Sequence, residues 1–100
     1  MFRKKDIIYS SGIGVCVVAD IVNLAVNKKS PVQYYQLISI YDSKKISYIP
    51  VQEHEVELRY LISVEVAEKK QKMKGLPQKE LQELEYVLKM QKAGKIQKNE

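Results

Sequence analysis

The chain has 100 residues, of which 45% are hydrophobic and 29% charged, with a formal net charge of +5. This length fits one small domain, the apolar fraction argues against disorder, and the basic excess favours acidic partners such as DNA, RNA or an acidic protein surface. The single cysteine excludes an internal disulfide or a zinc site built on cysteine pairs, and no apolar run approaches a membrane span.

The first part of the chain is predicted to be a β module. Residues 1–62 are rich in Ile, Val and Tyr, which favour strands. The connection at 42–44 is short enough to make its two flanking strands a hairpin. Pro50 lacks a backbone N–H, so the fourth strand should end or pair poorly there. The predicted strands are residues 6–9, 14–23, 33–41, 45–51 and 56–61.

The rest of the chain is predicted to be helical, because it is rich in Lys, Glu, Gln, Leu and Met. The first helix should run over about 64–74, with Ser63 as its cap and Gly75 as its stop. The second should run over about 77–93 and bury one apolar face. That face consists of Leu81, Leu84, Val87 and Leu88.

These elements predict a mixed fold that is mainly β plus α. Short strands joined by tight turns favour a small, bent β-barrel of SH3-like or Tudor-like type over residues 1–62. Residues 63–100 would form a short C-terminal helical hairpin. No Gly/Ser-rich linker separates the two parts, so we expect them to touch.

No residue pattern indicates catalysis. His54 lies among glutamates in a polar connection, and we interpret it as an exposed loop histidine. Cys16 lies in an apolar strand, which favours a buried, inert thiol over a nucleophile. We therefore expect no enzyme activity, no metal, no cofactor and no small-molecule substrate. The protein should be soluble and cytoplasmic, with no membrane contact.

A cluster of lysines follows in the first predicted helix and could meet nucleic-acid phosphates. The alternative is a solvated helix end, where the helix dipole favours positive charge. The sequence leaves these two interpretations open. The cluster consists of Lys69, Lys70, Lys72 and Lys74.

An ordered set of short segments in the β module carries a family resemblance. It resembles the polymerase-interacting domain of the CarD/CdnL family of bacterial transcription regulators, a module also found in transcription-repair coupling factors. The set covers about three fifths of the chain. It consists of Phe2, Asp6-Ile7-Ile8-Tyr9, Gly14-Val15-Cys16, Tyr34-Tyr35-Gln36-Leu37, Ile49-Pro50-Val51 and Leu58-Arg59-Tyr60-Leu61-Ile62.

The resemblance implies that the β module binds a lobe of the RNA polymerase β subunit, with main-chain bonds at a sheet edge. Tyr48 could supply an aromatic anchor. The alternative for Tyr48 is cross-strand packing with Tyr35 or Tyr41. The residues expected at the polymerase contact are Lys28, Lys29, Lys45, Ser47 and Tyr48.

The resemblance also implies contact between the helical part and promoter DNA. The family wedges a tryptophan into the DNA there and this chain has none, so we expect no wedge, and the lysine cluster is the candidate for a weak DNA contact. Two other functions stay open at this point. One is a general nucleic-acid-binding barrel of KOW or ribosomal type, and the other is a dimeric interaction module whose second helix buries Leu81, Leu84 and Leu88 on a partner.

Overall fold

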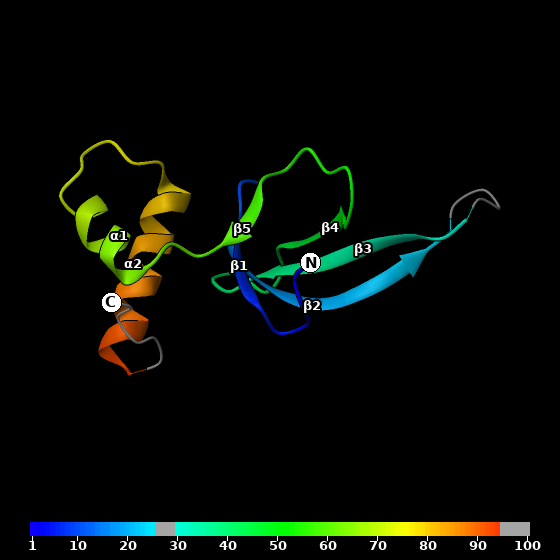
Figure 1. Ribbon diagram of the computed structural model, residues 1–100, viewed down its shortest axis with the longest axis horizontal. Coiled ribbons are helices and arrows are strands. Elements are labelled where there is room, and N and C mark those ends of the chain that lie inside the picture. The colour runs from blue at the N-terminus through cyan, green and yellow to red at the C-terminus, as the bar shows by residue number, and fades with distance from the viewer. Residues whose placement is uncertain (26–29, 95–100) are drawn as a thin grey trace.

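The computed structural model describes residues 1–25 and 30–94 of the chain. It contains five β-strands followed by two α-helices (Figure 1). The predicted strands are confirmed in number and order, and their ends differ from prediction by no more than two residues. The strands are β1 (Ile7–Ser10), β2 (Gly14–Leu24), β3 (Val32–Ser39), β4 (Ile46–Pro50) and β5 (Leu58–Tyr60).

The strands form one antiparallel sheet in the order β4-β3-β2-β1-β5. The predicted hairpin of β3 and β4 is confirmed, and β4 ends at Pro50 as expected. The sheet is not closed, because β4 and β5 lie at its two edges. The mixed β-plus-α class is therefore confirmed, whereas an SH3-like or Tudor-like barrel is not, since closure would need these two edges to pair.

One face of the sheet holds the main hydrophobic core, because side chains alternate across each strand. Phe2 packs against this core and places its ring edge-on to Tyr35 and Tyr60, at centroid distances of 5.7 and 4.9 Å. The backbone N–H of Phe2 also donates to the Tyr35 hydroxyl at 3.1 Å. The buried core residues are Ile8, Cys16, Val18, Tyr35, Leu37 and Ile49.

The first helix is shorter than predicted. The hydroxyl of Ser63 accepts from the Val66 N–H at 3.2 Å, which confirms the cap. However, α1 (Val64–Lys70) ends four residues before the predicted Lys74. Its last carbonyl groups accept turn bonds, one of them from the Met73 N–H to the Lys70 carbonyl at 2.9 Å. Gly75, at φ +79°, then reverses the chain in a conformation that glycine adopts without strain.

The second helix, α2 (Gln78–Lys92), matches the prediction within one residue at each end. It packs against α1 through a separate hydrophobic cluster that confirms its predicted apolar face. The buried members are Val64, Ala67, Leu84 and Val87, with Leu61, Ile62, Leu81 and Leu88 partly buried around them. Neither of the described helices has the length and apolar character needed to cross a membrane.

The helices lie at one end of the molecule and the far ends of β2 and β3 project at the other (Figure 1). The expected contact between the sheet and the helices is confirmed by polar bonds. The Lys79 ammonium donates to the Ser11 carbonyl at 3.1 Å. The Tyr41 hydroxyl donates to the Gln82 carbonyl at 3.0 Å.

Candidate functional site

Three of the five residues predicted for polymerase binding lie at an edge of the sheet. Ser47 and Tyr48 belong to β4, and Lys45 immediately precedes this strand. Lys45 and Tyr48 are exposed, whereas Ser47 is partly buried. The other two predicted contact residues, Lys28 and Lys29, lie outside the described residues. The candidate site is therefore the edge of β4.

The hydrogen-bond ladder between β3 and β4 determines which backbone groups of β4 are already bonded within the sheet. The Ser39 N–H donates to the Lys45 carbonyl at 3.0 Å, and the Val51 N–H donates to the Gln33 carbonyl at 2.9 Å. In an antiparallel pair, residues alternate between those that bond to the neighbouring strand and those that face away. The backbone N–H and carbonyl groups that face β3 are therefore those of residues 45, 47, 49 and 51.

The backbone groups of Ile46, Tyr48 and Pro50 consequently point away from the sheet. Ile46 and Tyr48 each present an N–H and a carbonyl there, whereas Pro50 presents a carbonyl alone. Proline is tolerated at this position because its missing donor would not have served the ladder with β3. β4 thus offers a short row of main-chain donors and acceptors to a further strand.

The side chains beside this edge are apolar and accessible. Ile46 and Tyr48 are 49% and 50% exposed. The Tyr48 hydroxyl accepts from the Gln36 amide at 3.0 Å, and Gln36 is its cross-strand partner. Packing of Tyr48 on Tyr35 is therefore wrong as an alternative, because Tyr35 pairs with Ile49 and is buried in the core.

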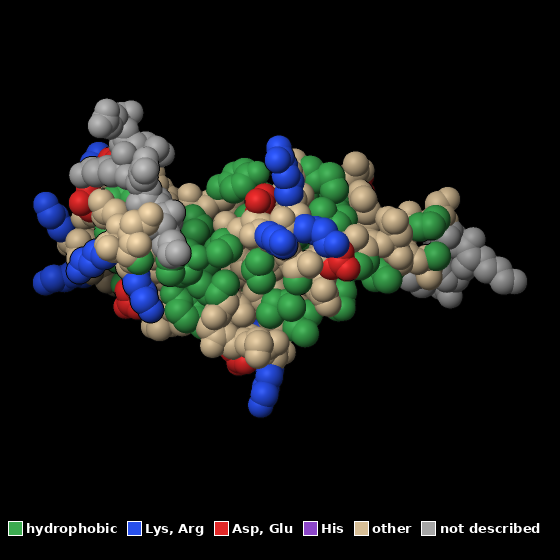
Figure 2. All heavy atoms as spheres, turned by 90° about the horizontal axis from the view of Figure 1, so that it is seen from below, with side chains coloured by type: hydrophobic (Ala, Val, Ile, Leu, Met, Phe, Trp, Pro, Cys, Tyr) green, Lys and Arg blue, Asp and Glu red, His purple; other side chains and the backbone are tan. Residues whose placement is uncertain are grey.

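An apolar row continues from this edge across the sheet. The register pairs Ile46 with Ile38, Ile38 with Val17, and Val17 with Ile7, all on the face opposite the core. Figure 2 shows hydrophobic side chains gathered over the middle of one face of the molecule, with Lys and Arg side chains around them. A partner strand at β4 could therefore extend its side chains over apolar surface.

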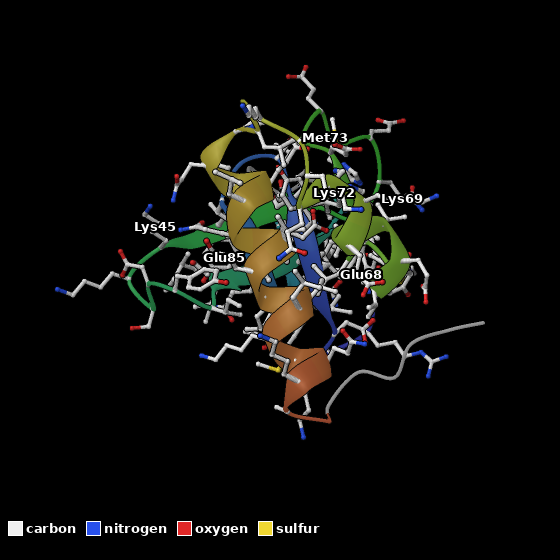
Figure 3. All side chains as sticks on the ribbon, turned by 90° about the vertical axis from the view of Figure 1, so that its left-hand side faces the viewer. Lys45, Glu68, Lys69, Lys72, Met73 and Glu85 are labelled. Carbon is white, nitrogen blue, oxygen red and sulfur yellow. The ribbon has the colours of Figure 1, made fainter. Side chains whose placement is uncertain are left out.

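The lysine cluster of the helices lies elsewhere. Lys70 bonds to the Glu80 carboxylate at 3.2 Å, so it belongs to the packing of α1 on α2 rather than to an open phosphate site. Its three companions are exposed. Seen end-on, Lys69 and Lys72 lie on one side of α2 and Lys45 lies on the other (Figure 3). The two predicted sites are therefore separate.

Acidic side chains partly neutralise the positive charge around this cluster. Lys69 and Lys72 line an open depression on α1 together with Glu65, Glu68 and Gln71. Carboxylates beside lysines weaken the attraction for a phosphate. This mixture favours the solvated-helix interpretation for Lys69 and Lys72, while Lys74 lies beyond the depression.

An ion pair that sequence reasoning missed joins the sheet to the helices. Glu83 is fully buried, and its two carboxylate oxygens accept from the Arg59 guanidinium at 2.7 and 2.9 Å. The Ile62 N–H donates to the same carboxylate at 3.0 Å. The guanidinium lies 4.2 Å from the centroid of the Tyr9 ring. The hydrogen bonds to Glu83 raise the pKa of Arg59, so it stays charged.

This ion pair gives a structural role to Arg59, which belongs to the last segment of the family resemblance. Arg59 lies in β5, and its side chain is directed into the junction with α2 rather than toward a partner. The sequence did not indicate burial of Glu83, because the predicted buried face of this helix consisted of apolar residues alone and Glu83 is charged. The available signal was its spacing, because Glu83 lies four residues before Val87 and therefore on the same side of the helix as a predicted apolar position.

Cys16 is buried, as expected. It is 0% exposed, and burial raises the pKa of its thiol to about 12. Its sulfur donates to the Ile8 carbonyl at 3.7 Å. The loop histidine is partly buried rather than exposed, with Nδ1 of His54 2.7 Å from the Val56 carbonyl oxygen. Within the described ranges no three His, Cys, Asp or Glu residues gather as a metal site would require.

The thiol of Cys16 should therefore resist alkylation in the folded chain. Because its pKa is raised from 9.0 to about 12, its thiolate fraction at pH 8 is on the order of a thousandfold below that of a free thiol. Iodoacetamide labelling followed by mass spectrometry should be very slow in buffer and fast in 6 M guanidinium. Equal rates in the two solvents would contradict the buried assignment.

Comparisons with known proteins add no relative. The chain matches no family model, no curated protein and no solved structure. What the chain does is therefore inferred from its own residues and from the geometry of the β4 edge.

Proposed function

We propose that this chain is a non-enzymatic bacterial transcription regulator that binds a lobe of the RNA polymerase β subunit through the edge of β4. Residues 1–62 would be the polymerase-interacting part, an open relative of the SH3-like or Tudor-like barrel, and residues 63–100 a helical appendage. The observation that carries the proposal is that β4 is an edge strand whose outward backbone groups, those of Ile46 and Tyr48, lie next to the exposed Lys45, whereas the predicted contact residue Ser47 faces β3. By holding the polymerase, the chain would stabilise promoter complexes.

The edge supplies affinity and selectivity in different ways. Main-chain groups of Ile46 and Tyr48 would bond to an extended strand of the β lobe. The half-exposed ring of Tyr48 would be the anchor, since aromatic side chains dominate many interfaces. Lys45, exposed at the start of the strand, would attract acidic groups and speed association.

A second candidate is a nucleic-acid-binding protein of KOW or ribosomal type. The observation that favours it is a set of three exposed lysines, one in the last turn of α1 and two in the connection between the helices. In the polymerase proposal the same lysines would touch promoter DNA only weakly, without contribution from Lys70. The set consists of Lys69, Lys72 and Lys74.

A binding assay separates the two candidates. The chain is immobilised and offered the isolated polymerase β lobe, duplex DNA and single-stranded RNA, each at 50 and 200 mM salt. The polymerase proposal predicts retention of the β lobe at both salt concentrations. Retention of nucleic acid alone, with a steep loss at higher salt, would support the second candidate instead.

The lysines provide a separate prediction. If the second candidate is right, changing Lys69, Lys72 and Lys74 together to glutamine should reduce the slope of log affinity for duplex DNA against log salt by about 2–3, because each phosphate contact contributes about 0.9. Affinity for the β lobe should not change, because the two sites lie apart (Figure 3). Fluorescence anisotropy over a salt series measures the slope, and an unchanged slope would remove these lysines from any DNA contact.

A further inference from the structure

The far half of β2 is a second open edge, independent of β4. The neighbouring chain segment supports β2 only as far as Val18, whose N–H donates to the Asp6 carbonyl and whose carbonyl accepts from the Lys5 N–H, both at 2.8 Å. Beyond that point β2 pairs with β3 alone, as far as Leu24 opposite Val32. Figure 1 shows these two strands extending beyond the rest of the sheet.

A β-bulge changes which groups of β2 face outward. The register shifts between Val18 and Asp20, so that one extra residue is inserted in β2. After the shift, the Ile21 N–H donates to the Asp20 carboxylate at 2.8 Å instead of to β3. By the alternation of the ladder, the backbone groups of Asn23 face outward as well.

The sequence of this open edge favours strand pairing. Residues 21–25 are Ile, Val, Asn, Leu and Ala, which include no charge and no proline. Leu24 and its partner Val32 are 42% and 48% exposed. Uncharged, apolar edges of this kind recruit further strands unless a bulge, a charge or a proline blocks them.

Asp20 is placed to block this edge. Its Oδ1 accepts from the first outward N–H of the open segment, and the same oxygen lies 3.2 Å from the Lys4 ammonium. A strand arriving at this position would bring a carbonyl against a carboxylate and would have to displace the ion pair. The bulge and the ion pair therefore lie at the point where the hydrogen bonds from residues 5 and 6 to β2 end.

We propose that Asp20, held by Lys4, guards the edge of β2 against pairing with a second copy of this chain. A second copy is the occupant that fits, because two identical uncharged segments can pair antiparallel without repulsion between like charges. The hydrogen bond from the Ile21 backbone, with help from Lys4, lowers the pKa of Asp20, so the carboxylate is charged at neutral pH.

The test compares Asp20→Ala with Asp20→Asn. Alanine removes the acceptor, whereas asparagine keeps an oxygen that can still accept from the Ile21 N–H. Light scattering after size-exclusion chromatography, over a concentration series, should show a monomer for the wild type. Asp20→Asn should shift toward the dimer mass less than Asp20→Ala does, because asparagine keeps the acceptor and loses only the ion pair with Lys4. Asp20→Ala should approach twice the chain mass as concentration rises. A dimeric wild type, or an alanine variant that stays monomeric at every concentration, would overturn the proposal.

Amide exchange followed by NMR locates the effect and covers a variant that folds poorly. In dilute Asp20→Ala the Ile21 N–H should exchange about five- to tenfold faster than in the wild type, as expected for one lost hydrogen bond. In the concentrated variant the Asn23 N–H should become protected. Protection at Tyr48 instead would assign the association to β4 and overturn the proposal. If Asp20→Ala does not fold, the exchange rate of the Ile21 amide in the wild type provides the test. A rate as fast as that of an unprotected amide would show that Asp20 does not hold this N–H, and would overturn the proposal.

Discussion

Replacing Glu83 with alanine is expected to destabilise the folded chain by about 3 kcal/mol or more, because it breaks a buried ion pair and leaves Arg59 without its partner. Glu83 is fully buried and accepts three hydrogen bonds, two from Arg59 and one from the Ile62 N–H. The side chain of Arg59 is 30% exposed, so water can replace part of the loss. Urea denaturation followed by circular dichroism measures the change.

The ion pair between Lys70 and Glu80 provides a matched control. It joins the two helices at a partly exposed position, with side chains 23% and 29% exposed. Glu80→Ala should therefore cost less than about 1 kcal/mol. Changing Glu83 and Arg59 together to leucine and methionine should be much milder than Glu83→Ala alone, since no charge is left unpaired. A Glu83→Ala variant as stable as the wild type would show that the ion pair does not hold the junction.

Replacing Tyr48 with proline is expected to weaken binding of the polymerase β lobe by at least about tenfold, through loss of one main-chain donor and of the aromatic anchor. The Tyr48 N–H faces away from β3, so the ladder with β3 should remain, as it does at Pro50. Isothermal titration calorimetry measures the affinity, and circular dichroism checks the fold.

Two variants of the same strand make this test specific. Tyr48→Phe keeps the backbone donor and the ring, so its affinity should stay near that of the wild type. Ser47→Pro removes an N–H that faces β3, so it should destabilise the sheet instead of leaving it intact. If Tyr48→Pro folds and binds as tightly as the wild type, the edge of β4 is not the contact.

The secondary structure of this chain could be predicted because local signals agree with the fold. Isoleucine, valine and tyrosine mark the strands, a short polar turn joins β3 to β4, and Ser63 begins α1. These features depend on neighbouring residues and need no knowledge of distant contacts. The expectation that Lys45 and Tyr48 lie at a sheet-edge contact came from the family resemblance, and the strand order of the structure places both at the edge of the sheet.

Features that depend on distant contacts could not be predicted. Closure of the sheet depends on whether β4 and β5 meet, and no local pattern encodes that. The bond between Arg59 and Glu83 joins residues 24 positions apart. The end of α1 at Lys70 was missed because the helix-favouring lysines continue past it, while the turn is set by packing of α1 on α2.

The proposed contact joins the outward backbone groups of β4 to an extended strand of the RNA polymerase β subunit. Hydrogen exchange of the chain with and without the isolated β lobe tests it most directly. The amides of Ile46 and Tyr48 should become protected on binding, while the amides of Ser47 and Ile49, which face β3, should change little. A complex that forms without protecting Ile46 and Tyr48, or no complex at all at low salt, would contradict it.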